Sequence, residues 1–255
     1  MLSNINFLDL FKLDSKKAFI CGGLGLIGRN ISKALHDAGA EVVILDIDEE
    51  SASMFITDNF SKNISFQYFD CSDLDNIEKN INELLENCGC PNIFVNCSWP
   101  RTDDFARNNF NDLKLNSLRR NIDIHLNSYA WLAIAAAECM SNNSIKGSII
   151  QYGSSYGLVG QDLSVYKGTD MKENASYSAS KGGIINLTRS MASYYGQYGI
   201  RVNTICPGGV KGHVAGKSSG QDETLLDNYS DKVPIGRLAD SFELAAPTLF
   251  LSSEA

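Results

Sequence analysis

The chain has 255 residues, of which 44% are hydrophobic and 20% are charged, so it is long enough to bury a sizeable core and has the composition of a globular protein. Its formal net charge of −8 argues against nucleic acid or an anionic membrane as a partner, because both would repel it. The sequence has no signal-peptide pattern and no apolar run of membrane-spanning length, so we expect a cytoplasmic protein that acts on a small molecule.

Apolar, strand-like runs alternate with helical patterns along the whole chain. The runs that have the character of buried strands are residues 17–21, 41–46, 64–69, 92–97, 147–152 and 201–206. The clearest helical patterns are residues 73–87, 130–140, 177–198 and 241–252. This alternation predicts an α/β protein with one doubly wound, parallel β-sheet flanked by helices, in a single domain over residues 1–255.

A glycine-rich turn joins the first predicted strand to the first predicted helix. Gly23, Gly25 and Gly28 satisfy the pattern G-x-G-x-x-G, in which glycine permits a tight turn and a close approach of the backbone to a pyrophosphate. The helix N-terminus then holds the negative charge. We therefore expect a dinucleotide to lie against Gly22, Gly25, Leu26, Ile27 and Gly28.

Asp46 ends the second predicted strand, where an acidic residue is expected to bind the ribose hydroxyls of the cofactor. A carboxylate at this place repels a 2′-phosphate, and no arginine follows it closely. NAD(H) is therefore favoured over NADP(H). The alternative is that Asp46 only caps the next helix.

Tyr177 and Lys181 are four residues apart in a predicted helix and would lie on the same face of it. A phenol has an ordinary pKa near 10, and a nearby cation lowers that pKa. The pair is therefore a candidate proton donor and acceptor. The alternative is a solvated helix face.

The order and spacing of the motifs resemble the single-domain short-chain dehydrogenase/reductase family over nearly the whole chain. They are the glycine turn, Asp46, Asp70-Cys71, Val95-Asn96, Gly153-Ser154-Ser155, Tyr177 with Lys181, and Pro207-Gly208. The resemblance implies a Rossmann fold and an NAD(P)-dependent interconversion of a secondary alcohol and a ketone. The further cofactor contacts that it implies are Asp70, Cys71, Asn96, Ser98, Tyr177, Lys181, Pro207, Gly208 and Val210.

The same resemblance implies the catalytic roles. Tyr177 matches the proton donor and acceptor, Lys181 the residue that lowers its pKa and binds the nicotinamide ribose, and Ser154 the serine that hydrogen-bonds the reacting oxygen. His125 stands where the family has an asparagine that holds a relay water. Imidazole can donate and accept a proton, so His125 either replaces that asparagine or is a structural histidine.

Three other features depart from the family pattern. Gly25 is present and Leu26 stands where a glycine is usual, and Trp99 places an indole beside the expected nicotinamide pocket. The chain also stops without the usual last strand. A second hypothesis is a catalytically weak NAD(H)-binding partner or regulatory subunit. It is motivated by three of these departures: His125, Trp99 and the missing strand.

Shorter motifs resemble bacterial oxidoreductases of flagellin modification and surface-sugar pathways. They are residues 96–101, 126–129, 166–169 and 182–186. This resemblance implies a sugar or activated-sugar substrate, with Trp99, Arg101, Ser155 and Tyr156 as candidate contacts. Apolar helices at 130–140 and 177–198 lead us to expect a homodimer or homotetramer. The seven cysteines are scattered and the three histidines are far apart in the sequence, so we expect free thiols and no metal site.

Overall fold

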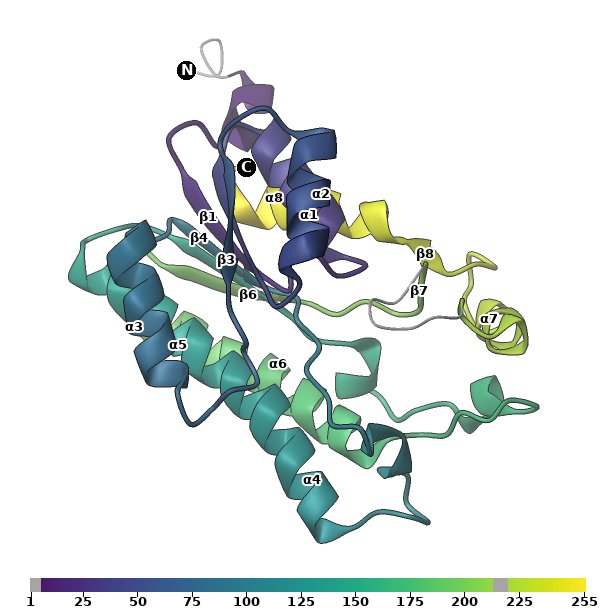
Figure 1. The fold of residues 1–255 in the computed structure, drawn as a ribbon. Coiled ribbons are helices and arrows are strands. Elements are labelled where there is room, and N and C mark those ends of the chain that lie inside the picture. The colour runs from purple at the N-terminus through teal and green to yellow at the C-terminus, as the bar shows by residue number, and fades with distance from the viewer. Residues whose placement is uncertain (1–5, 213–219) are drawn as a thin grey trace.

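The computed structural model describes residues 6–212 and 220–255. Its centre is a six-stranded, fully parallel sheet with the strand order β3-β2-β1-β4-β5-β6 (Figure 1). The strands are β1 (Lys17–Cys21), β2 (Glu41–Asp46), β3 (Ile64–Tyr68), β4 (Ile93–Asn96), β5 (Ser148–Tyr152) and β6 (Arg201–Ile205). The predicted doubly wound fold is confirmed.

Helices cover both faces of the sheet. One face carries α1 (Gly28–Asp37), α2 (Glu49–Asn59) and α8 (Ala245–Ser252), and the other carries α3 (Ile77–Cys88), α5 (Ser128–Asn142) and α6 (Ala175–Tyr195). The helix α4 (Leu115–Ile122) precedes α5, while α7 (Glu223–Ser230) lies beside the short strands β7 (Val210–Lys211) and β8 (Ala239–Asp240). Among the described residues, no helix is long and apolar enough to cross a membrane.

Successive residues along a strand point to opposite faces of the sheet and pack into two separate hydrophobic cores. Phe19, Val43 and Phe94 pack against α3, α5 and α6, whereas Ile20 and Val95 pack on the α1 side. All five side chains are at most 1% exposed. Burying a side chain of this size stabilises the fold by about 1.5–3 kcal/mol, which explains why the strands read as unbroken apolar runs rather than as alternating patterns.

The strand order reverses between β1 and β4. Cys21 pairs with Asn96 at their carboxyl ends, and Asn96 pairs in turn with Gln151 of β5. Tyr152, the last residue of β5, pairs with Ile205 of β6. The loops that follow β1, β4, β5 and β6 therefore leave the same edge of the sheet, and a crevice at such a reversal is where open α/β sheets bind ligands.

Candidate active site

The glycine turn is fixed by close backbone contacts. Gly22 has a φ of +78°, and a Cβ on it would lie 2.6 Å from the Cα of Ser98. A Cβ on Gly28 would lie 2.1 Å from the carbonyl oxygen of Gly22. Helix α1 then begins without a side-chain cap, and the N–H of Arg29 in its first turn donates to the carbonyl oxygen of Gly25 at 3.2 Å. This geometry fits a dinucleotide pyrophosphate, because the glycines leave room for a close approach to the turn and to the N-terminus of α1.

Asp46 is held at the end of β2 by this turn. One carboxylate oxygen accepts a hydrogen bond from the backbone N–H of Leu24 at 3.0 Å, and the other accepts one from the N–H of Ile47 at 2.8 Å. It therefore does more than begin the next helix, since Asp48 is the residue that caps α2. The carboxylate lies where the ribose of a dinucleotide on the glycine turn is expected.

Arg29 is a cation at the same end of the site that we did not single out from the sequence. Its Nε donates to the carbonyl oxygen of Leu24 at 2.8 Å, and its guanidinium lies 5.1 Å from the ring centre of Phe55. The sequence argument for NAD(H) considered only an arginine close after Asp46, whereas Arg29 directly follows Gly28. Both signs of charge are therefore present beside Leu24.

The other expected cofactor residues lie at or just after the carboxyl ends of the strands, on the same edge of the sheet. The amide oxygen of buried Asn96 accepts from the N–H and hydroxyl of Ser98, at 3.2 and 2.8 Å. Asp70 accepts two hydrogen bonds from Ser72, and Cys71 is buried in the core. The carbonyl of Pro207 accepts from the N–H of Ser155 at 2.9 Å. Of the last two expected cofactor residues, Gly208 is exposed and Val210 begins the short strand β7.

Tyr177 is placed by a helix cap. The side chain of Asn174 accepts a hydrogen bond from the N–H of Tyr177 at 2.9 Å, which starts α6 and sets Tyr177 in its first turn. Burial raises the pKa of the phenol, and a hydrogen bond from the Ser154 side chain opposes this shift. Ser154 itself is 6% exposed and follows β5 directly. The structure thus brings Ser154 and Tyr177 together.

Lys181 lies one helical turn after Tyr177 and is buried. Its Nζ donates to the carbonyl oxygen of Tyr152 at 2.7 Å and lies 5.8 Å from the ring centre of Tyr177. We expected its ammonium to lower the pKa of the phenol, and the structure corrects that expectation: burial raises the pKa of Tyr177. Burial also lowers the pKa of Lys181 to about 7, so its positive charge is only partly present at neutral pH.

His125 lies beside Tyr177, in an irregular turn between two helices. Residues Asp123–Asn127 form a π-helical turn between α4 and α5, a feature frequent at functional sites. The imidazole is 2% exposed, its Nε2 has no hydrogen-bond partner among the described residues, and its ring centre lies 6.3 Å from that of Tyr177. Burial, then Lys181, lowers the pKa of His125 well below its ordinary value. The imidazole is therefore neutral at pH 7.

Trp99 and Arg101 lie on the open side of Tyr177. The ring of Trp99 meets that of Tyr177 edge to face, with centres 6.4 Å apart, and meets Phe105 in the same way at 5.8 Å. The guanidinium carbon of Arg101 lies 4.5 Å from the Trp99 ring centre. Trp99 therefore contacts the candidate catalytic residue Tyr177 directly, and Arg101 is linked to Tyr177 through the ring of Trp99.

Three further tyrosines form another wall. Tyr156 lies 6.4 Å from Tyr229 of α7 between ring centres, and burial raises the pKa of Tyr156. Burial likewise raises the pKa of Tyr166 to about 12, while a hydrogen bond with Tyr156 opposes the shift. Asn228 of α7 donates to the carbonyls of Val165 and Lys167, at 3.2 and 2.8 Å, and so ties α7 to this loop. The loop that begins at Tyr166 was expected from the sequence to lie where it could meet the substrate, whereas Tyr229 was not expected, because no local pattern marks it.

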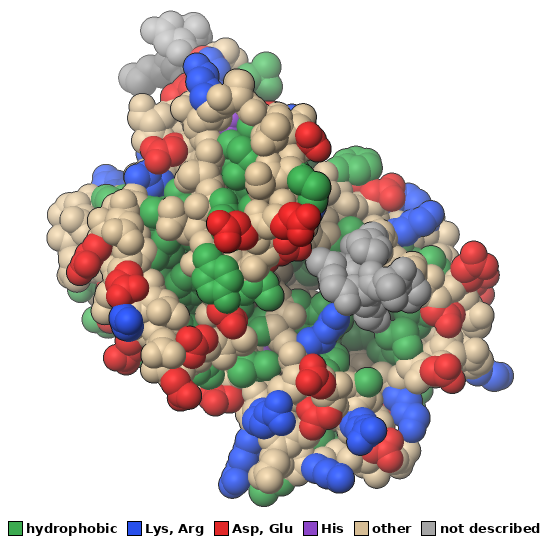
Figure 2. Space-filling view, viewed as in Figure 1, with side chains coloured by type: hydrophobic (Ala, Val, Ile, Leu, Met, Phe, Trp, Pro, Cys, Tyr) green, Lys and Arg blue, Asp and Glu red, His purple; other side chains and the backbone are tan. Residues whose placement is uncertain are grey.

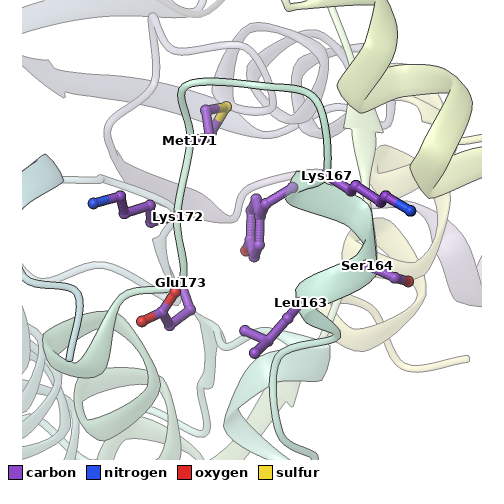
Figure 3. Close-up of a pocket in the computed structure, with 7 residues that line it drawn as sticks. Leu163, Ser164, Lys167, Met171, Lys172 and Glu173 are labelled. Atoms are coloured by element: carbon purple, nitrogen blue, oxygen red, sulfur yellow. The ribbon is translucent and has the colours of Figure 1, made fainter. Parts of the chain in front are cut away.

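A pocket of about 450 Å³ opens on the outer part of the same loop (Figure 3). Tyr166 lines it, together with Leu163, Ser164, Lys167, Met171, Lys172 and Glu173. Figure 3 shows Lys167 and Lys172 pointing away from the pocket on opposite sides. None of the proposed catalytic side chains lines it, and Tyr166, which interacts with Tyr156, is the lining residue nearest to them in the network of contacts.

Comparison with known proteins gives consistent matches over the whole chain. A family model described as enoyl-(acyl carrier protein) reductase matches residues 25–255. The chain is 25% identical to the ribulose-forming D-arabinitol 2-dehydrogenase of Candida tropicalis, over 98% of this chain and 89% of that protein.

Two solved structures are similar in fold as well as in sequence. A short-chain dehydrogenase from Leptospira borgpetersenii with bound NAD⁺ has a TM-score of 0.81 and 27% identity, over 99% of this chain and 91% of that one. A gluconate 5-dehydrogenase from Burkholderia cenocepacia in complex with NADP and tartrate has a TM-score of 0.81 and 25% identity, over 98% and 92%.

Proposed function

The chain belongs to the short-chain dehydrogenase/reductase family and is an oxidoreductase that acts on CH–OH groups, and from this premise we propose that it interconverts a secondary alcohol and a ketone on a sugar or activated sugar, using NAD(H). The observation that carries the proposal is the convergence of Ser154, Tyr177 and Lys181 at the edge of the sheet that also holds the glycine turn. A bound nicotinamide would supply the hydride transfer.

Each side chain has a task in that reaction. In the direction of reduction, the hydroxyl of Ser154 hydrogen-bonds the carbonyl oxygen and polarises it, and the phenol of Tyr177 donates the proton. The raised pKa of Tyr177 keeps the phenol protonated at neutral pH, which suits a donor. Lys181 binds the ribose and passes a proton toward the phenol, because its pKa of about 7 allows both of its protonation states.

His125 is proposed as the next member of the relay. Two observations support this role: the Nε2 atom has no hydrogen-bond partner among the described residues, and the ring lies beside Tyr177. Such an imidazole can accept a proton through a water molecule and then transfer it. The neutral imidazole that burial enforces is the form that can accept. A purely structural histidine at this depth would be expected to have both ring nitrogens satisfied.

The choice of NAD(H) rests on Asp46. Its carboxylate is aimed at the ribose end of the crevice and would repel a 2′-phosphate. Arg29 acts in the opposite sense, although its Nε is already engaged by Leu24 and its face by Phe55. We therefore propose a preference for NAD(H) and not an absolute one.

A sugar substrate is supported by the wall of the crevice. Tyr156, Tyr166 and Tyr229 offer hydroxyl groups and aromatic faces, the combination that binds polyols. The pocket beside Tyr166 gives room for the distal part of an activated sugar.

We also propose a homodimer or homotetramer that assembles through α5 and α6. Trp131 on α5 is 39% exposed and borders a hollow of about 610 Å³ beside α3, and Tyr194 and Tyr198 at the end of α6 are 59% and 45% exposed. Large aromatic side chains left exposed together mark an interaction surface. Sedimentation as a monomer at micromolar concentration would refute this.

The proposed function is tested by assaying NAD⁺ and NADP⁺ reduction with a panel of polyols, sugars and nucleotide-activated sugars. Tyr177→Phe should lower the rate roughly 10³-fold while NADH still binds, because it removes only the proton donor. Tyr198→Phe, in the 3₁₀ turn Gly196–Tyr198 that follows the same helix, is the matched control: it keeps the exposed aromatic ring, removes only a hydroxyl, and should leave the rate unchanged. Binding of NADH without turnover of any panel member, and no effect of Tyr177→Phe, would favour a cofactor-binding partner protein instead.

A further inference from the structure

We propose that the substrate carries an anionic oxygen group, a carboxylate or a phosphate, and that Arg101 binds this group on the face of Trp99. The inference rests on the proposed function and names the substrate class for the same site. It starts from the position of the guanidinium, which only one aromatic ring separates from Tyr177. A group held there belongs to the same small molecule as the reacting carbon.

The guanidinium of Arg101 has no carboxylate partner among the described residues. Acidic residues are close in sequence, at Asp103 and Asp104, yet the carboxylate of Asp104 accepts from Thr102 instead. Among the described residues, Arg237 is the only arginine in an ion pair, with Glu243 at 2.6 Å. Arg101 differs from the other unpaired arginines because its guanidinium stacks on the ring that meets Tyr177, where none of its N–H groups donates to a described residue.

Stacking on Trp99 prepares Arg101 to bind an anion. A guanidinium that lies on an indole is held by cation–π attraction and gives up less freedom when it meets a ligand. Its edge still presents two parallel N–H groups, which match the two oxygens of a carboxylate or phosphate. Trp99 itself packs edge to face on Phe105, and the residue as a whole is 43% exposed.

Asn121 positions the segment that carries both side chains. It is 2% exposed, its amide oxygen accepts from the N–H of Thr102 at 3.2 Å, and its amide nitrogen donates to the Thr102 hydroxyl at 2.7 Å. A second bond to the carbonyl of Ser117 anchors the amide in α4. These hydrogen bonds fix the backbone of Thr102, next to Arg101, so the segment is already in place before a ligand binds.

The wider surface does not supply the attraction for an anion. Figure 2 shows basic and acidic side chains mixed over the lower part of the molecule, where α4 lies. Arg119 and Arg120 of α4 contribute exposed positive charge, and Asp103 contributes exposed negative charge. The selectivity for an anion therefore rests on Arg101 itself.

The test uses the intrinsic fluorescence of Trp99. The chain has two tryptophans, so Trp131→Phe leaves Trp99 as the only one. The NAD⁺-loaded protein is titrated with gluconate, with glucitol 6-phosphate and with neutral arabinitol. We expect at least one of the two anions to change the Trp99 emission and to bind at least tenfold more tightly than arabinitol. The comparison of gluconate with glucitol 6-phosphate identifies the source of the anionic group.

Arg101→Ala should remove that advantage, and Arg101→Lys should keep part of it. Arg107→Ala is the matched control, because Arg107 lies in the same segment but is exposed. Calorimetric titration of the chain with both tryptophans repeats the comparison. The inference is overturned if arabinitol binds as tightly as both anions, if no probe perturbs Trp99, or if Arg101→Ala leaves the anion affinity unchanged.

The two proposals fail separately. Turnover of arabinitol that is indifferent to Arg101→Ala would leave the dehydrogenase function standing and remove the anion site. Tight binding of gluconate through Arg101 without oxidation of any polyol would leave the anion site standing and remove the proposed function.

Discussion

The proposed cofactor half and the proposed substrate half of the site are built in different ways. The cofactor half depends on close approaches of the backbone. The backbone of Gly22 lies against Ser98, and that of Gly28 lies against Gly22, so closely that a Cβ atom would not fit on either glycine. The substrate half depends on side chains that four separate segments deliver, those around Trp99, His125, Tyr156 and Tyr229. A backbone constraint requires one residue type at a fixed spacing, whereas a side-chain wall can be assembled in many ways.

The difference predicts which half tolerates change. Substitutions in the cofactor half should act through folding and cofactor affinity, and substitutions in the substrate half should act on rate and selectivity. Each of the following variants tests one side of that division.

Gly28→Ala should have the largest effect. A Cβ at this position lies 2.1 Å from a backbone oxygen that cannot move alone, so we expect a loss of about 3 kcal/mol or more in the free energy of unfolding, and loss of NAD⁺ binding. Urea denaturation measures the first and titration the second. Gly160→Ala is the control, because a Cβ there has nothing within 4 Å. Unchanged stability of Gly28→Ala would show that the turn is not rigid.

His125→Ala should come next, with a rate lower by roughly 10²-fold and intact cofactor binding. Burial holds the pKa of His125 well below the ordinary range, so the rate of the unmodified enzyme should stay level through neutral pH and fall only below the usual histidine pKa, when the imidazole gains its proton. His125→Asn should keep most of the rate and lose that acid limb. His36→Asn, on α1, should change neither. An unaltered rate and profile in His125→Ala would make this histidine a packing residue.

Lys181 should make stability depend on pH. Its pKa is about 7 when folded and near 10.5 when unfolded, so between these values the unfolded state binds more protons and the free energy of unfolding rises with pH. The contribution is about 1.5 kcal/mol between pH 7 and pH 8.5. Lys181→Met should remove this slope in urea denaturation, and Lys172→Met, which is exposed, should keep it. Equal slopes in all three proteins would mean that Lys181 stays charged in the fold.

Asp46→Asn should have the smallest effect. Loss of the carboxylate weakens NAD(H) and relieves repulsion of a 2′-phosphate, which narrows the cofactor preference by about tenfold, or about 1.4 kcal/mol. Arg29→Gln should shift the preference in the opposite direction, because it removes the cation beside Leu24. Both are read from kcat/KM with NAD⁺ and NADP⁺. Equal use of the two cofactors by the unmodified enzyme would contradict the role of Asp46.

The sequence predicted the sheet and the tight glycine turn after β1, and both predictions had the same physical basis. Buried parallel strands need continuous apolar runs, and the turn after β1 needs glycine where the backbone approaches itself. Asp46 was recognisable because its place in the chain is fixed by the end of β2. These features are local, so spacing alone reveals them.

The substrate half could be predicted only in part. The expectation about His125 came from its position in the helix, but the π-helical turn around it has no sequence signature that we used. Tyr229 meets Tyr156, and Asn121 clamps Thr102, through contacts that only the tertiary fold creates. The raised pKa of Tyr177 was also missed, because burial is a property of the assembled site rather than of a pair four residues apart.

The π-helical turn gives this enzyme a sensitivity to length rather than to residue identity. One such turn holds one residue more than an α-helical turn, and each residue rotates a helix by about 100°. Because the π turn absorbs this extra residue, deleting a single residue from Asp123–Asn127 would convert it to an ordinary α-helical turn and leave α4 and α5 in their present phase. Asn121 would keep its hydrogen bond to Thr102, and the change would fall on the residues of the turn itself, His125 among them. In a lineage of such proteins, the position of this imidazole could therefore change through one deletion, without any substitution elsewhere in the site.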